Sequence, residues 1–153
     1  MATPVQIAYA DIAMALDWSS AGYGENRALI GRANSSNPGH IYFRAAPGEY
    51  EPEPLPDGID DESIYLAVPH KNEMDLGRDL IFRFVETQAP QIESQVKAAF
   101  RQRGAYSKFK SAVDRAGLLD RWFEFEAAQT RAALTSWAEE NGFVVVDAPP
   151  VQG

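Results

Sequence analysis

The sequence of 153 residues contains no cysteine, which excludes disulfide bonds, a thiol nucleophile and cysteine-ligated metal sites. It also has no uninterrupted apolar run near the roughly 20 residues that a membrane-spanning helix needs. The residues that follow Met1 lack the basic region and the apolar stretch of a signal peptide. From these absences we expect a cytoplasmic protein that has no membrane partner.

Residues that commonly carry catalysis are also scarce. The two histidines, His40 and His70, do not form a metal-binding pair, and a Gly-rich phosphate loop, a nucleophile elbow and a kinase signature are missing. Asp75 and Asp79 lie four positions apart on a predicted helix, where two carboxylates either hold a metal or form a solvated face that pairs with arginines. The solvated face is the commoner outcome, so we predict no catalytic residue, no cofactor and no metal.

Charge is abundant and unevenly distributed. The net charge is -8. Residues 97–121, which we call the basic segment, carry 7 basic and 2 acidic groups, whereas residues 1–96 carry 6 basic and 15 acidic groups. The acidic chain argues against general attraction to nucleic acid. The basic segment either pairs with acidic faces elsewhere in the fold or binds a partner, and internal pairing is the more ordinary interpretation.

The N-terminal part predicts one helix and three strands. Apolar spacing favours a helix over Tyr9–Trp18, with a stripe of Ile7, Ala8, Ile12, Ala13, Ala15 and Leu16. Arg27–Arg32 and His40–Arg44 have strand composition and flank a segment rich in turn formers, which predicts a hairpin. Ile64–Val68 is a third predicted strand, closed by a proline.

Residues 45–61 combine four prolines with six acidic residues. Proline removes backbone donors and the acidic groups repel one another, so we predict an exposed, extended loop without a core of its own. Such a segment is suited to a basic partner, although a plain connector is the more ordinary interpretation.

The C-terminal part predicts mainly helices. The expected helical segments are a run through Leu76–Val85 capped by Asn72, a helix opened by Pro90, a short helix over Ala105–Ala116 and a long helix over Leu118–Glu140. Gly104 separates two of them, where a positive φ suits glycine.

Two apolar faces of these helices are predicted to be core. Tyr106, Phe109 and Val113 share one face of the short helix. The long helix presents a broad aromatic face, made of Leu118, Trp122, Phe125, Gln129, Ala133 and Trp137.

The predicted fold class is α+β. We expect a small antiparallel sheet with a β-hairpin and four to five helices, with a mainly helical C-terminal half. Phe143–Val146 is predicted as a last strand that joins the sheet. The prediction is one domain over residues 1–147 followed by a flexible tail over residues 148–153.

Several segments resemble a bacterial family catalogued as the uncharacterised protein family UPF 0158. The likeness rests on Arg103-Gly104-Ala105-Tyr106 with Phe109-Lys110, on Gly117-Leu118-Leu119-Asp120-Arg121-Trp122-Phe123, and on Trp137 with Glu140-Asn141-Gly142. Val68-Pro69 and Asp75-Leu76-Gly77-Arg78-Asp79-Leu80 extend it upstream. The resemblance covers roughly residues 64–143 and implies a small cytoplasmic bacterial protein. It transfers no catalytic residues, because the family has none established.

These observations favour a non-enzymatic, cytoplasmic protein-interaction or regulatory module whose partner is another protein. The predicted binding residues are Arg101, Arg103, Lys108, Lys110 and Arg121. One alternative is RNA binding through the basic segment, since basic and aromatic residues together can track phosphates and stack on bases. Burial of the aromatic residues would weigh against that alternative. A second alternative is an enzyme with a site near His70, because a neutral histidine near a helix N-terminus can act as a base or an electrophile.

Overall fold

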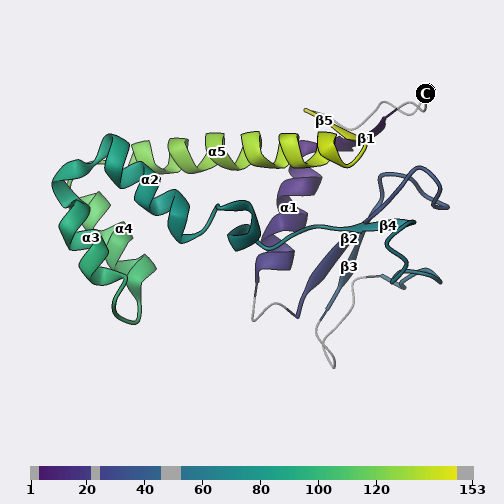
Figure 1. Cartoon of the computed structure of the whole chain (residues 1–153), viewed down its shortest axis with the longest axis horizontal. Coiled ribbons are helices and arrows are strands. Elements are labelled where there is room, and N and C mark those ends of the chain that lie inside the picture. The colour runs from purple at the N-terminus through teal and green to yellow at the C-terminus, as the bar shows by residue number, and fades with distance from the viewer. Residues whose placement is uncertain (1–3, 22–24, 46–52, 148–153) are drawn as a thin grey trace. The chain divides into compact units, whose positions relative to one another are not determined.

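The computed structural model describes residues 4–21, 25–45 and 53–147. Contacts group the chain into two compact units (Figure 1). Unit 1 comprises Met1–Met74 and Arg131–Gly153, and unit 2 comprises Asp75–Thr130. The single domain over residues 1–147 stays a prediction. The predicted tail lies outside the described residues.

The elements confirm the α+β class. The described residues form five α-helices, a three-stranded antiparallel sheet and a two-stranded parallel sheet, and the C-terminal half is mainly helical. Helix α5 (Leu119–Glu140) spans the boundary in sequence, so its residues 119–130 belong to unit 2 and its residues 131–140 to unit 1.

The antiparallel sheet of unit 1 has the strand order β3-β2-β4. Strands β2 (Arg27–Gly31) and β3 (Ile41–Arg44) form the predicted hairpin, and β4 (Tyr65–Ala67) pairs with the other edge of β2. Strand β2 is the central strand and is mostly apolar. Strands β3 and β4 cover its two edges, and one face of the sheet packs on the core, so its side chains are shielded from water. The hairpin and the third strand are therefore confirmed.

The second sheet is a parallel pair of β1 (Val5–Ala8) and β5 (Phe143–Val146), in which Val5 lies opposite Phe143. The predicted last strand exists, but the prediction that it joins the antiparallel sheet is wrong. Strand β1 was missed, because its residues Ile7 and Ala8 were assigned to the stripe of the following helix. Both are buried, and an apolar run this short fits a strand as well as a helix turn.

Helix α1 (Tyr9–Ser20) packs on the antiparallel sheet and buries Ile12, Ala15 and Leu16. Its last turn is tied to neighbouring segments by side-chain hydrogen bonds. The indole N–H of Trp18 donates to the carbonyl of Arg27 at 3.0 Å, and the Ser19 hydroxyl donates to the carbonyl of Pro69 at 3.1 Å. The side chains of Trp18 and Ser19 thus link the end of the helix to strand β2 and to the loop after β4.

The acidic loop expected over residues 45–61 is described only in part, because residues 46–52 lie outside the described residues. Its second half is not free of the core. Ile59 is buried with Leu29, Tyr42 and Tyr65, and Leu55 packs against this cluster. Two polar contacts add to the attachment: Arg44 Nη1 forms an ion pair with Asp60 Oδ1 at 2.6 Å, and His40 Nε2 forms a hydrogen bond with Glu53 Oε1 at 2.9 Å. The prediction of an exposed loop is therefore wrong at Leu55 and Ile59, which pack against the antiparallel sheet, whereas Asp57, Asp60 and Asp61 are exposed as predicted.

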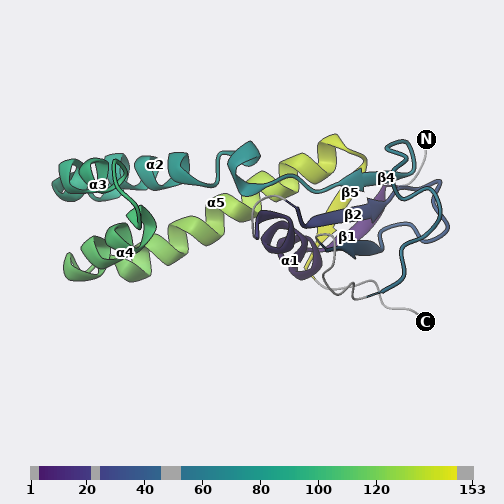
Figure 2. The same ribbon diagram turned by 90° about the horizontal axis from the view of Figure 1, so that it is seen from below.

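Unit 2 contains α2 (Arg78–Gln88), the 3-10 turn η2 (Pro90–Ile92), α3 (Glu93–Ala99), α4 (Ala105–Arg115) and the first half of α5. Figure 2 shows α2 and α3 in one layer and α4 with the start of α5 in the other. Pro90 stands at the first position of η2, as predicted. The order of the four predicted helices is confirmed.

The predicted start of α2 is wrong. Asn72 lies in a 3-10 turn, η1 (Lys71–Met74), and α2 begins at Arg78 with Gly77 as its N-cap and no side-chain cap. Asp75 between them has a φ of 58°, which breaks helical continuity. The helical spacing of the apolar residues from Leu76 onward hid this break, because Leu76 is buried without being helical.

An aromatic cluster forms the core of unit 2. The ring of Phe84 lies 5.3 Å from Trp122, 5.4 Å from Phe125 and 6.4 Å from Phe109, measured between centroids. Phe109 and Trp122 are 4.9 Å apart, edge to face. These separations lie in the favourable range for aromatic pairs, each of which adds about 0.5–1.5 kcal/mol beyond area burial.

The aromatic face predicted on α5 is core at Trp122, which is 1% exposed, but Trp137 is only half-buried. In unit 1 the fully buried residues of α5 are Leu134 and Ala138. A face that follows every third or fourth residue drifts around a straight helix, so the core-facing stripe near the C-terminal end shifts away from Trp137.

We expect Trp122→Ala to lower the free energy of unfolding by about 3–5 kcal/mol, because it opens a cavity among three aromatic rings. Chemical denaturation measures this loss. Phe123→Ala is the matched control, since Phe123 is 43% exposed and its truncation should cost about 1 kcal/mol or less. Equal losses in the two variants would contradict the assignment of Trp122 as core.

Gly104 precedes α4 with a φ of 71°, as the sequence predicted, and no atom lies within 4 Å of where a Cβ would stand. The cost of Gly104→Val is therefore backbone strain alone, roughly 1–2 kcal/mol. Gly104→Asn should cost less, because asparagine tolerates this region. Denaturation curves that show Val and Asn to be equally stable would disprove the strain.

Candidate functional site

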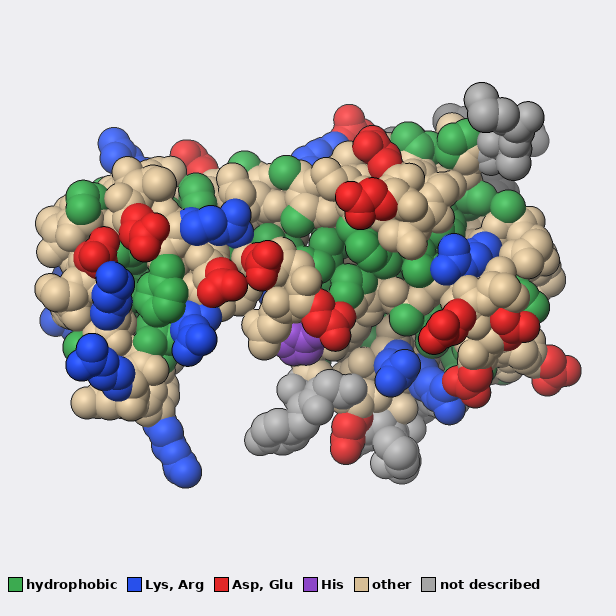
Figure 3. All heavy atoms as spheres, in the orientation of Figure 1, with side chains coloured by type: hydrophobic (Ala, Val, Ile, Leu, Met, Phe, Trp, Pro, Cys, Tyr) green, Lys and Arg blue, Asp and Glu red, His purple; other side chains and the backbone are tan. Residues whose placement is uncertain are grey.

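The basic segment lies in unit 2, on α3, α4, the connection between them and the first turn of α5. Arg101 and Arg103 occupy the connection, and Arg121 lies in the first turn of α5. All three are exposed, and their side chains make no hydrogen bond or ion pair with the described residues. Figure 3 shows Lys and Arg side chains over the α2–α4 part of the chain, interspersed with acidic ones.

Arg101, Arg103 and Arg121 form no ion pair with the described residues. Lys97 pairs with Glu93 one turn earlier on α3, at 3.1 Å. The other ion pairs among the described residues belong to unit 1, namely Arg44–Asp60, Lys71–Asp17 and Arg131–Asp147. Internal pairing, the more ordinary interpretation of the basic segment, therefore has no support at Arg101, Arg103 or Arg121 within the described ranges.

Lys110 lies among aromatic rings. Its Nζ is 5.7 Å from the centroid of Tyr106 and 5.4 Å from that of Phe123, both within cation–π range. Tyr106 is 46% exposed and Phe123 is 43% exposed. Lys110 is thus partly held against the protein, and the patch offers two aromatic faces next to a cation.

The exposure of Tyr106 corrects a prediction. Phe109 and Val113 are fully buried, as expected for the apolar face of α4, but Tyr106 is not. Tyr106 lies in the first turn of the helix, and side chains lean toward the helix N-terminus, so its ring extends past the core. Phe123 was not predicted as a surface site, and its neighbours Trp122 and Phe125 gave no sign that it points outward.

The Tyr106 phenol has a pKa above the ordinary 10.0. Burial of the hydroxyl is the main cause, the Glu126 carboxylate acts in the same direction, and the Trp122 indole N–H partly offsets both. That N–H is itself buried and makes no hydrogen bond of normal geometry with the described residues. The indole N–H therefore acts on Tyr106 as a weak electrostatic contact, because its geometry is not that of a hydrogen bond.

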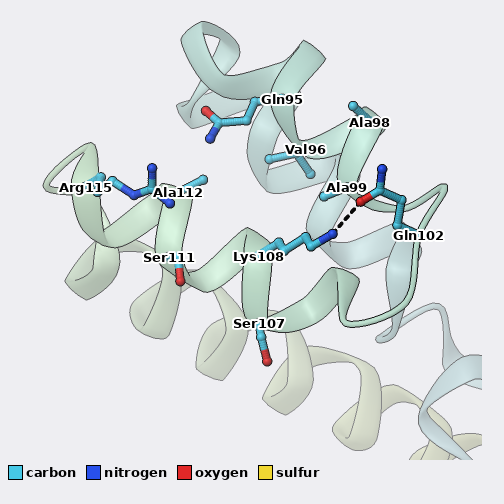
Figure 4. A pocket seen from close by; sticks show the side chains of 10 residues that line it. All are labelled: Gln95, Val96, Ala98, Ala99, Gln102, Ser107, Lys108, Ser111, Ala112 and Arg115. Atoms are coloured by element: carbon cyan, nitrogen blue, oxygen red, sulfur yellow. Dashed lines mark hydrogen bonds between the residues drawn. The ribbon is translucent and has the colours of Figure 1, made fainter.

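A groove of about 390 Å³ runs between α3 and α4 (Figure 4). Lys108 donates a hydrogen bond to Gln102 Oε1 at one end, and Arg115 lies with Gln95 at the other. None of the residues that line the groove is acidic. Arg115 was not among the predicted binding residues; its signal in the sequence is its position seven residues after Lys108 on one helix.

His70 lines a separate pocket of about 550 Å³ in unit 1, with Arg27, Glu73 and Trp137. Its Nδ1 accepts from the backbone N–H of Asn72 at 3.0 Å, so the neutral ring carries its proton on Nε2. Ser19 also lines this pocket, but its hydroxyl donates to backbone carbonyls. The pocket therefore holds a candidate acid–base group without an activated hydroxyl nucleophile.

No helix in the described ranges is long and apolar enough to cross a membrane. The same ranges hold no group of three or more His, Asp or Glu side chains placed to bind a metal ion. No protein-family model, no curated protein and no solved structure matches the chain.

We expect Glu126→Gln to lower the pKa of Tyr106, because it removes a negative charge that opposes ionisation. The pKa should stay above 10.0, since burial is the larger cause and remains. NMR of the Tyr106 ring carbon as a function of pH measures it. A folded-state pKa above the unfolded one contributes stability that is present below about pH 10 and lost as pH rises through the folded value. An unchanged or raised pKa in Glu126→Gln would contradict the coupling.

Proposed function

We propose that the protein is a cytoplasmic protein-interaction module that binds an acidic segment of another protein through the basic segment. The observation that carries this proposal is the state of Arg101, Arg103 and Arg121, which are exposed and unpaired among the described residues. Arginine side chains are enriched at the energetic centres of protein interfaces, because the planar guanidinium binds carboxylates through two hydrogen bonds.

The surroundings of the arginines support a protein partner. Tyr106 and Phe123 are large, exposed aromatic side chains beside Lys110, and such residues bury much area on binding at low entropic cost. The resemblance to UPF 0158 and the absence of cysteine make the bacterial cytoplasm the expected setting.

Single-stranded nucleic acid is the second candidate. The exposure of Tyr106 favours it, because an exposed aromatic ring beside Lys110 is the arrangement that stacks bases and holds phosphates. The local charge weighs against it. Unit 2 carries nine Lys and Arg against eight Asp and Glu, and Glu126 raises the pKa of Tyr106 by its negative charge. A base that stacked on Tyr106 would bring its phosphate toward Glu126, and a nucleic acid carries such a charge on every nucleotide, unlike a peptide with a few acidic residues.

The deciding experiment is affinity isolation from cell extract with and without nuclease, using the double variant Arg101→Glu/Arg103→Glu. We expect nuclease-resistant protein partners that the double variant loses at least tenfold, with binding that weakens as salt rises. Arg78→Glu is the matched control, because Arg78 is exposed in the same unit outside the basic segment.

Two outcomes would count against the proposal. Equal retention of partners by the double variant and by the control would remove the basic segment as the binding surface. Retention that disappears with nuclease would replace the proposal with nucleic-acid binding.

Arg103→Ala should change the free energy of unfolding by only about 0.5 kcal/mol, as for most surface sites, so that a loss of binding is not a loss of folding.

A further inference from the structure

The groove between α3 and α4 has two cations at a defined spacing. Lys108 and Arg115 lie seven residues apart on α4, which is close to two helical turns, or about 10.5 Å along the axis. Both line the groove, and Figure 4 shows them at its opposite ends. The side chain of Arg115 makes no hydrogen bond or ion pair with the described residues, and Lys108 is held by the neutral amide of Gln102.

Between the cations the groove is lined by small side chains, which are apolar except for Ser111. Val96 and Ala112 form a buried floor at 1% and 4% exposure. Ala98 and Ala99 lie along the α3 side, where the absence of long side chains leaves space for groups from outside. An apolar floor between two cations combines the parts that an amphipathic ligand needs, since apolar contact supplies affinity and the charges set register.

We propose that this groove binds an amphipathic α-helix of the partner protein that carries acidic residues at positions i and i+7 and apolar residues at i+3 and i+4. The inference rests on the proposed function and names the form of the acidic segment. In a helix, residues i and i+7 lie on the same face about two turns apart, which matches the separation of Lys108 and Arg115. The residues between them on that face point at the floor formed by Val96 and Ala112.

The groove, with a volume of about 390 Å³, is too small to hold a whole helix. A helix with its side chains is about 10–12 Å across, so the partner helix lies over the groove and inserts only its apolar side chains. Carboxylates at the two ends then meet Lys108 and Arg115. The amides of Gln95 and Gln102 stand beside these cations and donate to the same carboxylates.

The test uses two synthetic helical peptides of identical composition. One carries Glu at i and i+7 with Leu at i+3 and i+4; in the other the second Glu is moved to i+5, which places it on a different face. Binding to the full chain is measured by fluorescence anisotropy. We expect the first peptide to bind at least tenfold more tightly, and Lys108→Ala/Arg115→Ala to remove that difference.

Two further variants separate groove binding from general charge attraction. Ala98→Phe fills the groove at an exposed position without changing charge, and should weaken the first peptide at least tenfold. Arg78→Ala/Lys97→Ala removes two exposed cations outside the groove and should leave the preference between the peptides intact.

Equal binding of the two peptides, or a preference that survives Lys108→Ala/Arg115→Ala, would overturn the groove inference. In that case partner loss in Arg101→Glu/Arg103→Glu would still support the proposed function, because neither arginine lines the groove. If the partner is retained by Arg101→Glu/Arg103→Glu but lost by the groove variants, the groove stands and the arginines lose their role.

Discussion

The packing of Trp122 against Phe84 and Phe109 is the contact on which unit 2 depends. These three rings come from α5, α2 and α4, so one cluster joins helices that are distant in sequence. The other buried side chains of unit 2 are aliphatic, and the aromatic rings bury more area each than these do. The cluster sets how α4 and the start of α5 meet, and these carry the cations Lys108, Lys110, Arg115 and Arg121.

The orientation of α4 follows from that contact. Phe109 and Val113 turn inward, which leaves Lys108, Ser111 and Arg115 on the side that faces α3 and solvent. Small residues on α3 keep this side open, because they cannot fill the space between the helices. The groove is therefore a consequence of where the aromatic core lies and of how small the α3 residues are. The same geometry leaves Tyr106, one turn before Phe109, beyond the end of the core.

Unit 1 is held by different means. A hairpin and a third strand form its sheet, and α1 is fastened at its last turn by hydrogen bonds from Trp18 and Ser19 to backbone carbonyls. Most of the chain's negative charge belongs to this unit, with fourteen Asp and Glu against five Lys and Arg. Two contacts attach the acidic loop to β3 and its start. Arg44 in β3 forms an ion pair with Asp60, and His40 just before β3 forms a hydrogen bond with Glu53. The two units thus differ in charge as well as in architecture.

The sequence alone determined the elements that have a long apolar periodicity or clear turn residues at their ends, namely α1, α4, α5 and the hairpin. It also determined the positive φ of Gly104. It also placed the cations in one segment. Pairing of β1 with β5, the burial of Ile59 and the exposure of Tyr106 were decided by tertiary structure. Periodicity reports which residues of an element share a face, and composition reports their charge. Neither reports which distant strand completes a sheet, or where along a helix its partner ends, because those depend on contacts between segments far apart in the chain.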